Sequence, residues 1–172
     1  MKTMYRLLSA AFLLVFGSAC QETDSSVEDF TGNEVTYPLL AGSDYAVHGY
    51  VTFKERKGGS ALAIVQLTGT EGNMWHPVHL HLGYISEPDA DIAVLLNPVK
   101  ASTGRSETVI THLSDETPVT YAELIALYAS VKVHLSESGP ERDIILAGGN
   151  IGQAYTQANG RRAMELAVCK SE

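Results

Sequence analysis

Four of the six histidines in this chain lie in two short runs that could bind a transition metal. His76, His79 and His81 fall within six residues, and His134 lies in the later run 130–135. Alternate side chains of a β-strand point to opposite faces, so His79 and His81 would share one face. Imidazole is the commonest protein metal ligand, and two ligands at i and i+2 can close on one ion when a neighbouring strand supplies a third. The sequence therefore predicts a copper or zinc site formed by His79, His81, His134 and His76.

The apolar residues of the two runs support this arrangement. In both runs they alternate with the histidines and would face a core; they are Val78, Leu80, Leu82, Val131, Val133 and Leu135. His134 would then lie on the wetter face beside Lys132. The alternative is that these histidines occupy ordinary hydrogen-bonded positions without a metal. His48 and His112 are further candidates, but we expect each to face solvent or a neighbouring strand.

The N-terminal residues predict a targeting segment. Lys2 and Arg6 precede the apolar stretch 7–16, and small residues then lead into Cys20. This pattern resembles the lipobox of bacterial lipoproteins, which implies a signal peptide over 1–19 and a lipid on Cys20. Gly17 departs from that pattern, which usually has leucine three residues before the cysteine. The alternatives are an ordinary secreted protein with a leftover cysteine and an uncleaved anchor.

The composition after the signal peptide fits a protein of the cell envelope. The acidic residues after Cys20 resemble the tract of surface-exported lipoproteins in Bacteroidetes-type bacteria, which implies an outer-membrane anchor and exposure at the surface. Residues 1–19 hold two basic and no acidic residues, so the remainder carries a net charge of −10. Such a charge excludes nucleic acid as a partner. The sequence does not identify a protein or glycan partner.

Short strands with frequent turns organise the rest of the chain. Residues 20–36 are expected to form a flexible acidic tether, and residues 37–172 a single domain. We predict strands at 45–53, 60–67, 75–82, 107–113, 130–135, 143–147 and 162–169, and an irregular excursion over 86–104. Thr120 and Glu123 form a capping pattern that predicts a helix of two or three turns. The predicted fold is an all-β, antiparallel, Greek-key-like sandwich or barrel of seven to eight strands with one short helix.

The order of several motifs resembles the CHRD (chordin-type) domains of bacterial lipoproteins. These motifs are Gly49-x-x-x-Phe53, His76-Pro77-x-His79-x-His81, Thr120-Tyr121-x-x-Leu124, Val131-x-Val133-His134-Leu135-Ser136 and Ala147-Gly148-Gly149-Asn150-Ile151-Gly152. The resemblance covers residues 45–153. It implies an extracellular β-rich domain and little chemistry.

The histidine runs also resemble those of Cu/Zn superoxide dismutases. In that family the last two histidines of a His-x-x-His-x-His run and a later Val-x-His strand ligate copper, which implies His79, His81 and His134 here. Leu95 and Leu96 precede Asn97-Pro98, so the family's bridging histidine is missing, as are the other zinc ligands and the disulfide. Arg162 is the nearest match to the active-site arginine; the alternative is a solvated surface charge.

Two hypotheses follow. The first is a lipid-anchored, non-enzymatic CHRD-like binding module with a histidine metal site. The second is a copper-dependent redox protein of the superoxide dismutase type. The sequence has no Gly-x-Ser-x-Gly nucleophile motif and no phosphate-binding glycine loop, so other common chemistries receive no support.

Overall fold

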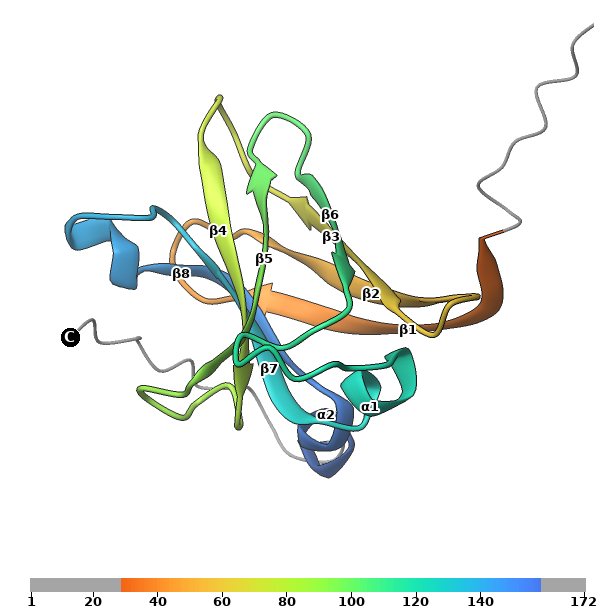
Figure 1. Cartoon of the computed structure of the whole chain (residues 1–172). Helices are drawn as coiled ribbons and strands as arrows, with labels where there is room; N and C mark the ends of the chain where they lie inside the picture. Colours follow the sequence, from red (N-terminus) through yellow and green to blue (C-terminus); the bar gives the residue numbers. More distant parts are fainter. Residues whose placement is uncertain (1–28, 159–172) are drawn as a thin grey trace, which may run out of the picture.

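The structure, a computed structural model, describes residues 29–158 and shows them as a closed barrel of antiparallel strands (Figure 1). Eight strands form this part of the chain: β1 (Phe30–Ala41), β2 (His48–Arg56), β3 (Ala61–Thr68), β4 (Trp75–Leu82), β5 (Ile92–Lys100), β6 (Arg105–Ile110), β7 (Tyr128–His134) and β8 (Ile145–Ile151). Three short helices accompany them: α1 (Tyr121–Ile125), the 3-10 helix η1 (Pro140–Asp143) and α2 (Gly152–Ala158). The prediction of an all-β fold with seven to eight strands is confirmed.

The strand order is that of a Greek key. Around the barrel it runs β1-β2-β3-β6-β5-β4-β7-β8, and β8 closes the barrel by pairing with β1. Strands β4, β5 and β6 are consecutive neighbours, and β7 returns by a long connection to lie beside β4. Both α1 and α2 lie near one end of the barrel (Figure 1). This return places β7, which carries His134, directly against β4, which carries His79 and His81.

Alternating apolar side chains fill the barrel. Val51 and Phe53 of β2, Leu80 of β4, and Val131 and Val133 of β7 are fully buried. They belong to one continuous cluster that also takes in side chains of β1, β3, β5 and β8. Burial of a side chain of this size stabilises a fold by about 1.5–3 kcal/mol. The period-two pattern seen in the sequence is therefore the pattern of the core.

Several predicted boundaries are wrong. The excursion predicted over 86–104 is interrupted by β5, which occupies 92–100 and pairs with β4; only 86–91 and the turn 101–104 lie outside strands. The predicted tether reached residue 36, but β1 begins at Phe30 and pairs with β2 at Phe30 and over residues 34–39. Its first residues are mostly exposed, so backbone pairing rather than an apolar pattern holds them in the sheet. The capping box at Thr120 is present, yet the helix ends after five residues.

Some predictions fall outside the described residues. Cys20, the signal peptide, the acidic tract, Arg162 and the strand predicted at 162–169 all lie there. Within residues 29–158, no helix is both long and apolar enough to cross a membrane.

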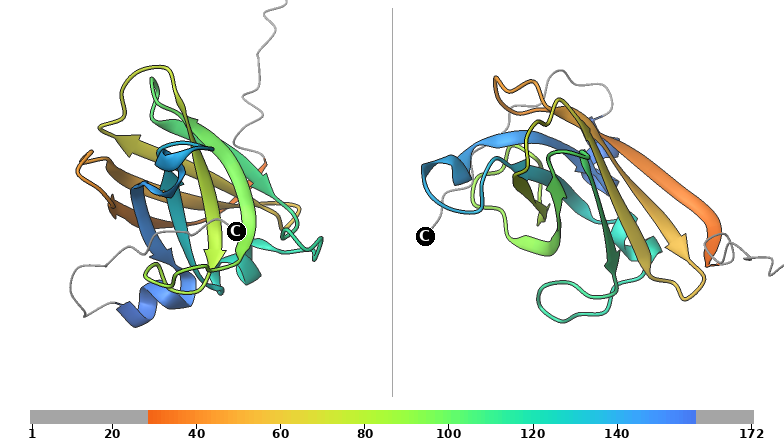
Figure 2. Two further views of the ribbon diagram at one scale, coloured as in Figure 1. Left: turned by 90° about the vertical axis from the view of Figure 1, so that its left-hand side faces the viewer. Right: turned by 90° about the horizontal axis from the view of Figure 1, so that it is seen from above.

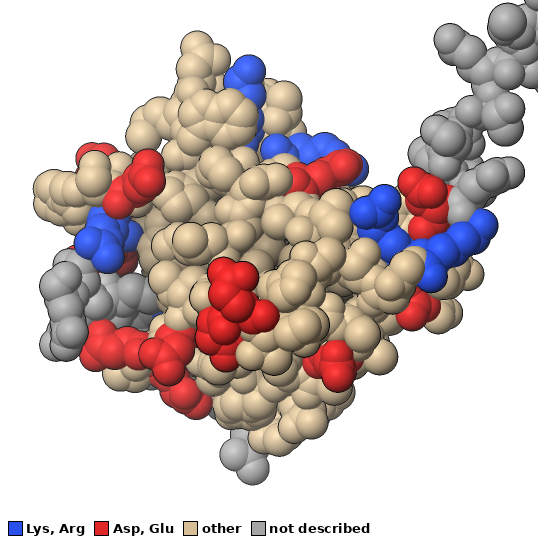
Figure 3. Space-filling model, viewed as in Figure 1, with Lys and Arg blue, Asp and Glu red and all other residues tan. Residues whose placement is uncertain are grey.

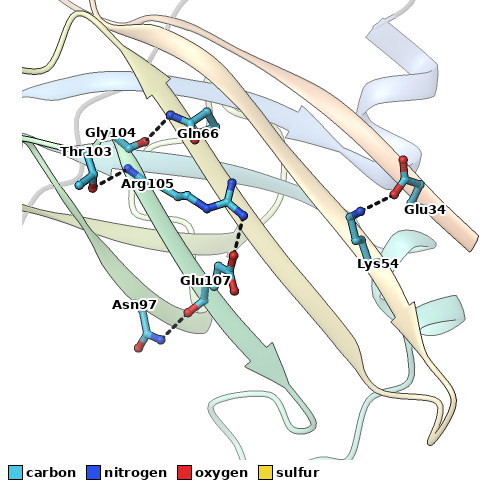
Figure 4. A network of polar contacts seen from close by, with 8 residues as sticks. All are labelled: Glu34, Lys54, Gln66, Asn97, Thr103, Gly104, Arg105 and Glu107. Atoms are coloured by element: carbon cyan, nitrogen blue, oxygen red, sulfur yellow. Dashed lines mark hydrogen bonds and ion pairs between the residues drawn. The ribbon is translucent and has the colours of Figure 1, made fainter. Parts of the chain in front are cut away.

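The outer surface of the barrel is exposed to solvent over some strands and covered over others. Over β1, β2, β3 and β6 the surface carries exposed polar pairs such as Lys54–Glu34, whose charged atoms lie 2.9 Å apart, and Arg105–Glu107 (Figure 4). Acidic groups gather at several places on the face shown in Figure 3, and the basic side chains lie mainly at its edges. By contrast, two loops cover the outer face of β4, β7 and β8. Three of the four predicted metal ligands, His79, His81 and His134, lie on this face.

Candidate metal centre

Three of the four predicted ligands converge in the structure. His79 and His81 of β4 and His134 of β7 each offer a ring nitrogen, and these three atoms lie within 4.8 Å of one another. The ring centroids of His79 and His134 are 4.8 Å apart, and those of His79 and His81 are 5.7 Å apart. A single ion could therefore contact all three rings after small side-chain rotations. The structure thus brings together three of the four predicted residues and leaves out His76.

The pairing of β4 with β7 explains this convergence. His79 lies opposite Lys132 and His81 lies opposite Ser130, so His134 is a diagonal neighbour of His79 on the same outer face. The ladder shifts register between Leu80 and His81 on the β5 side, and between Val133 and His134 on the β8 side. The extra residue lies in β5 in the first case and in β8 in the second, so β4 and β7 keep the alternation that places the three histidines on one face.

Two connections bury this outer face. The β4–β5 loop, residues 83–91, packs Ile85 completely, and the Ile85 amide donates a hydrogen bond of 2.7 Å to the Asn150 side chain. The β7–β8 connection carries η1 and lies over the same side of the barrel (Figure 2, left). Lys132 is fully buried here, and its ammonium donates a 3.4 Å hydrogen bond to the Glu87 carbonyl. The expectation that His134 and Lys132 occupy a wetter face is therefore wrong, because both side chains are buried.

The same two connections orient two of the rings. His81 Nδ1 lies 2.7 Å from the Ala90 carbonyl oxygen, and His134 Nδ1 lies 2.9 Å from the Arg142 carbonyl oxygen. A carbonyl oxygen can only accept, so each Nδ1 carries the proton and each Nε2 carries a lone pair. Metal-bound histidines almost always donate their other N–H in this way, which fixes the tautomer and the ring orientation. Among residues 29–158, His134 Nε2 is buried and has no hydrogen-bond partner.

Burial also holds the three rings in the neutral form. It lowers the pKa of His79 to about 4, with repulsion from His134 and His81 as smaller causes. Burial lowers the pKa of His81 to about 4, partly offset by the hydrogen bond to Ala90. The pKa of His134 is lowered by burial against the opposing effect of its bond to Arg142. Metal ligands must be deprotonated, so near neutral pH protons compete little for these nitrogens.

The remaining histidines lie elsewhere. His76 is buried, but it shares the inward parity of Val78, and its Nδ1 lies 3.1 Å from the Leu135 carbonyl oxygen. It is not a member of the three-histidine cluster. His48 and His112 are exposed and also lie outside the cluster. Leu82, predicted to face the core, is the last residue of β4 and is 40% exposed.

Sequence reasoning missed the groups that surround the ligands. The carbonyls of Ala90 and Arg142 that orient the rings belong to the backbone, so the residue types at these positions do not reveal their role. Ser130 and Asp143 each bury a side-chain oxygen that has no hydrogen-bond partner within the described part of the chain. Ser130 had a detectable signal, since it shares the alternate positions of Lys132 and His134. Nothing in the sequence pattern singles out Asp143.

Comparisons with known proteins add no assignment. The chain matches no protein-family model, no curated protein and no solved structure.

Proposed function

We propose that this protein is a metal-binding module of the cell envelope that holds a copper or zinc ion through His79, His81 and His134. The observation that carries the proposal is the approach of three imidazole nitrogens to within 4.8 Å of one another, with His81 and His134 buried and His79 half-buried. Copper and zinc both accept imidazole nitrogen, and three such ligands suit either ion.

A purely structural role explains the cluster less well. A buried acceptor without a partner costs about 1–3 kcal/mol, and native structures contain few of them. Here His134 Nε2 is such an acceptor, and it lies beside two other desolvated rings. A bound ion would accept the lone pairs of all three rings. The cost of burying them would then be offset by coordination.

Metal titration tests this function directly. The purified chain is stripped with a chelator, and its affinities for Cu²⁺ and Zn²⁺ are measured by competition with a chromophoric chelator. Substitution of His79, His81 or His134 by Gln should weaken binding by at least about tenfold. His48→Gln and His112→Gln serve as matched controls and should bind as the wild type does. Equal affinities in all five variants, or no binding by the wild type, would reject the proposal.

The envelope location is a separate part of the proposal. It is supported by the lipobox-like run ending at Cys20 and by the order of motifs shared with CHRD-type lipoproteins. Growth with a radiolabelled fatty acid should label the wild type and leave Cys20→Ser unlabelled. Equal labelling of both chains would reject a lipid on Cys20 and leave the metal site untouched.

Copper-dependent redox chemistry of the superoxide dismutase type is the second candidate. It is favoured by the three-ligand set, which leaves coordination positions for a substrate, and by His79, which is the least buried of the three rings. Copper-loaded wild type would then consume superoxide faster than the copper-loaded His79→Gln variant. Equal rates of superoxide consumption in the two proteins would reject the redox function and leave the metal-binding function.

A further inference from the structure

A buried lysine and a buried serine lie among the three histidines on the outer face of β4 and β7. Lys132 lies directly opposite His79 across the ladder, and Ser130 lies directly opposite His81. The Cβ atoms of directly opposite residues are about 4.5–5.5 Å apart, and alternate residues of one strand are about 7 Å apart. Lys132 is also the alternate neighbour of His134 on β7, so it lies next to each of the three candidate ligands.

The Ser130 hydroxyl has no partner in this position. Ser130 is fully buried, and its Oγ makes no hydrogen bond within residues 29–158. A buried hydroxyl without a partner destabilises the fold, because it has lost its hydrogen bonds to water. Zinc and copper favour histidine, cysteine and carboxylate ligands over a neutral hydroxyl. The Ser130 O–H is therefore placed to donate to another ligand of the ion rather than to bind the ion itself.

The charge of the bound ion calls for a negative group at the site. Burial lowers the pKa values of the three imidazoles, so near neutral pH they are neutral ligands. A divalent ion held by neutral ligands brings its whole charge into a buried place, and burial of a charge is costly unless the charge is paired. Three histidines also fill only three of the four positions of a tetrahedral zinc or tetragonal copper shell. An anion in the fourth position would balance part of the charge.

The site is nearest to solvent on its β5 side. His79 is the least buried of the three rings, and Leu95, its partner on β5, is 64% exposed. Across β4 in the same row, Lys132 is fully buried, and its ammonium donates to the Glu87 carbonyl oxygen at 3.4 Å. An anion that enters beside His79 therefore approaches a buried ammonium from the solvent side.

We infer that the ion held by His79, His81 and His134 takes a small inorganic anion as its fourth ligand, and that Ser130 and Lys132 bind this anion. The inference deepens the proposed function and rests on it. Ser130 donates its O–H to the anion, and Lys132 donates an ammonium N–H. The anion has only a few atoms, because both of its donors are fully buried. Ser130 and Lys132 thus act on the ligand of the ion and not on the ion.

Azide is the probe, because it gives a charge-transfer absorption band when it coordinates Cu²⁺. The purified full chain is loaded with Cu²⁺ and titrated with azide, and its copper affinity is measured separately by chelator competition without azide. Ser130→Ala and Lys132→Met each remove one donor at nearly constant volume. Ser102→Ala and Lys57→Met make the same changes at exposed positions and serve as matched controls. Circular dichroism establishes that each variant is folded, and Lys132→Gln replaces Lys132→Met should the latter not fold.

The wild type should show a saturable azide band. Ser130→Ala and Lys132→Met should each bind azide about 10–100-fold more weakly, because each loses a hydrogen bond to a charged group. Their copper affinities without azide should not fall, since neither side chain is a ligand of the ion. Both control variants should match the wild type in both measurements.

The results separate this inference from the proposed function. Copper binding by the wild type without an azide band would overturn the anion site and leave the metal site standing. Wild-type azide affinity in either Ser130→Ala or Lys132→Met would also overturn it. So would a parallel fall in copper and azide affinity, which would show general damage to the metal site. Absence of copper binding by the wild type would overturn the proposed function itself.

Discussion

Acid should destabilise the metal-free protein through His81. Its imidazole is 2% exposed, and burial lowers its pKa to about 4 from its ordinary value of 6.5. A histidine whose pKa is lower in the folded state favours folding above the unfolded value, and this contribution is lost as the pH falls toward the folded value. Linkage for one group with these two pKa values gives a loss of up to about 2.4 kcal/mol between pH values near 7 and near 4.5.

Urea denaturation of chelator-treated protein at those two pH values measures this loss. His81→Gln keeps a donor for the Ala90 carbonyl but does not titrate, so its stability should fall less on acidification than that of the wild type. Carboxylates that protonate in the same range affect both chains alike, and the difference between them isolates His81. His48→Gln, at an exposed position, should behave as the wild type does. An equal loss in the wild type and His81→Gln would refute the burial argument for this ring.

Two further substitutions test the framework of the barrel. Thr120→Ala removes the side chain that accepts the Glu123 amide at 3.3 Å, and it should lower the free energy of unfolding by about 1 kcal/mol in urea denaturation; no change would mean that the cap of α1 is dispensable. Gly149→Ala would place a Cβ 2.1 Å from the Pro38 carbonyl oxygen of the neighbouring strand. It should therefore lower the melting temperature and reduce the free energy of unfolding by roughly 1–3 kcal/mol. Gly58→Ala has open space at its Cβ and should reduce the free energy of unfolding much less. Equal melting temperatures of Gly149→Ala and Gly58→Ala would contradict the close approach of β8 to β1.

The period of two in the sequence was sufficient to predict the centre of the site. It separated His79 and His81 from Val78 and Leu80, and it set His134 apart from Val131 and Val133, as the structure shows. That logic depends only on the pleat of a strand. It failed at the end of β4, where Leu82 has the parity of Leu80 and is nevertheless 40% exposed.

Features that depend on tertiary structure were not predictable. Strand β5 contains Asn97 and Pro98, which resemble a turn, and it forms because its backbone pairs with β4 on one side. Burial of Lys132 follows from two loops folding over the sheet, and no local pattern encodes that cover. Likewise, the ring orientations of His81 and His134 come from loop carbonyls distant in sequence. Alternation along a strand identifies its two faces, whereas the loops between strands determine which outer face is buried.

The barrel does not need its buried polar face in order to have a core. Leu80, Val131 and Val133 already fill the inside of β4 and β7, while Ser130, Lys132 and His134 are buried on the outside at a cost in desolvation. Under the proposed function, that cost is offset when an ion binds, because a ligand specific to the folded state adds about 4 kcal/mol at roughly a thousand times its Kd. The 83–91 loop and η1 supply the orienting carbonyls, so they should be the segments that an ion protects most from amide exchange. Protection confined to the strands would instead show that the cover forms independently of the metal.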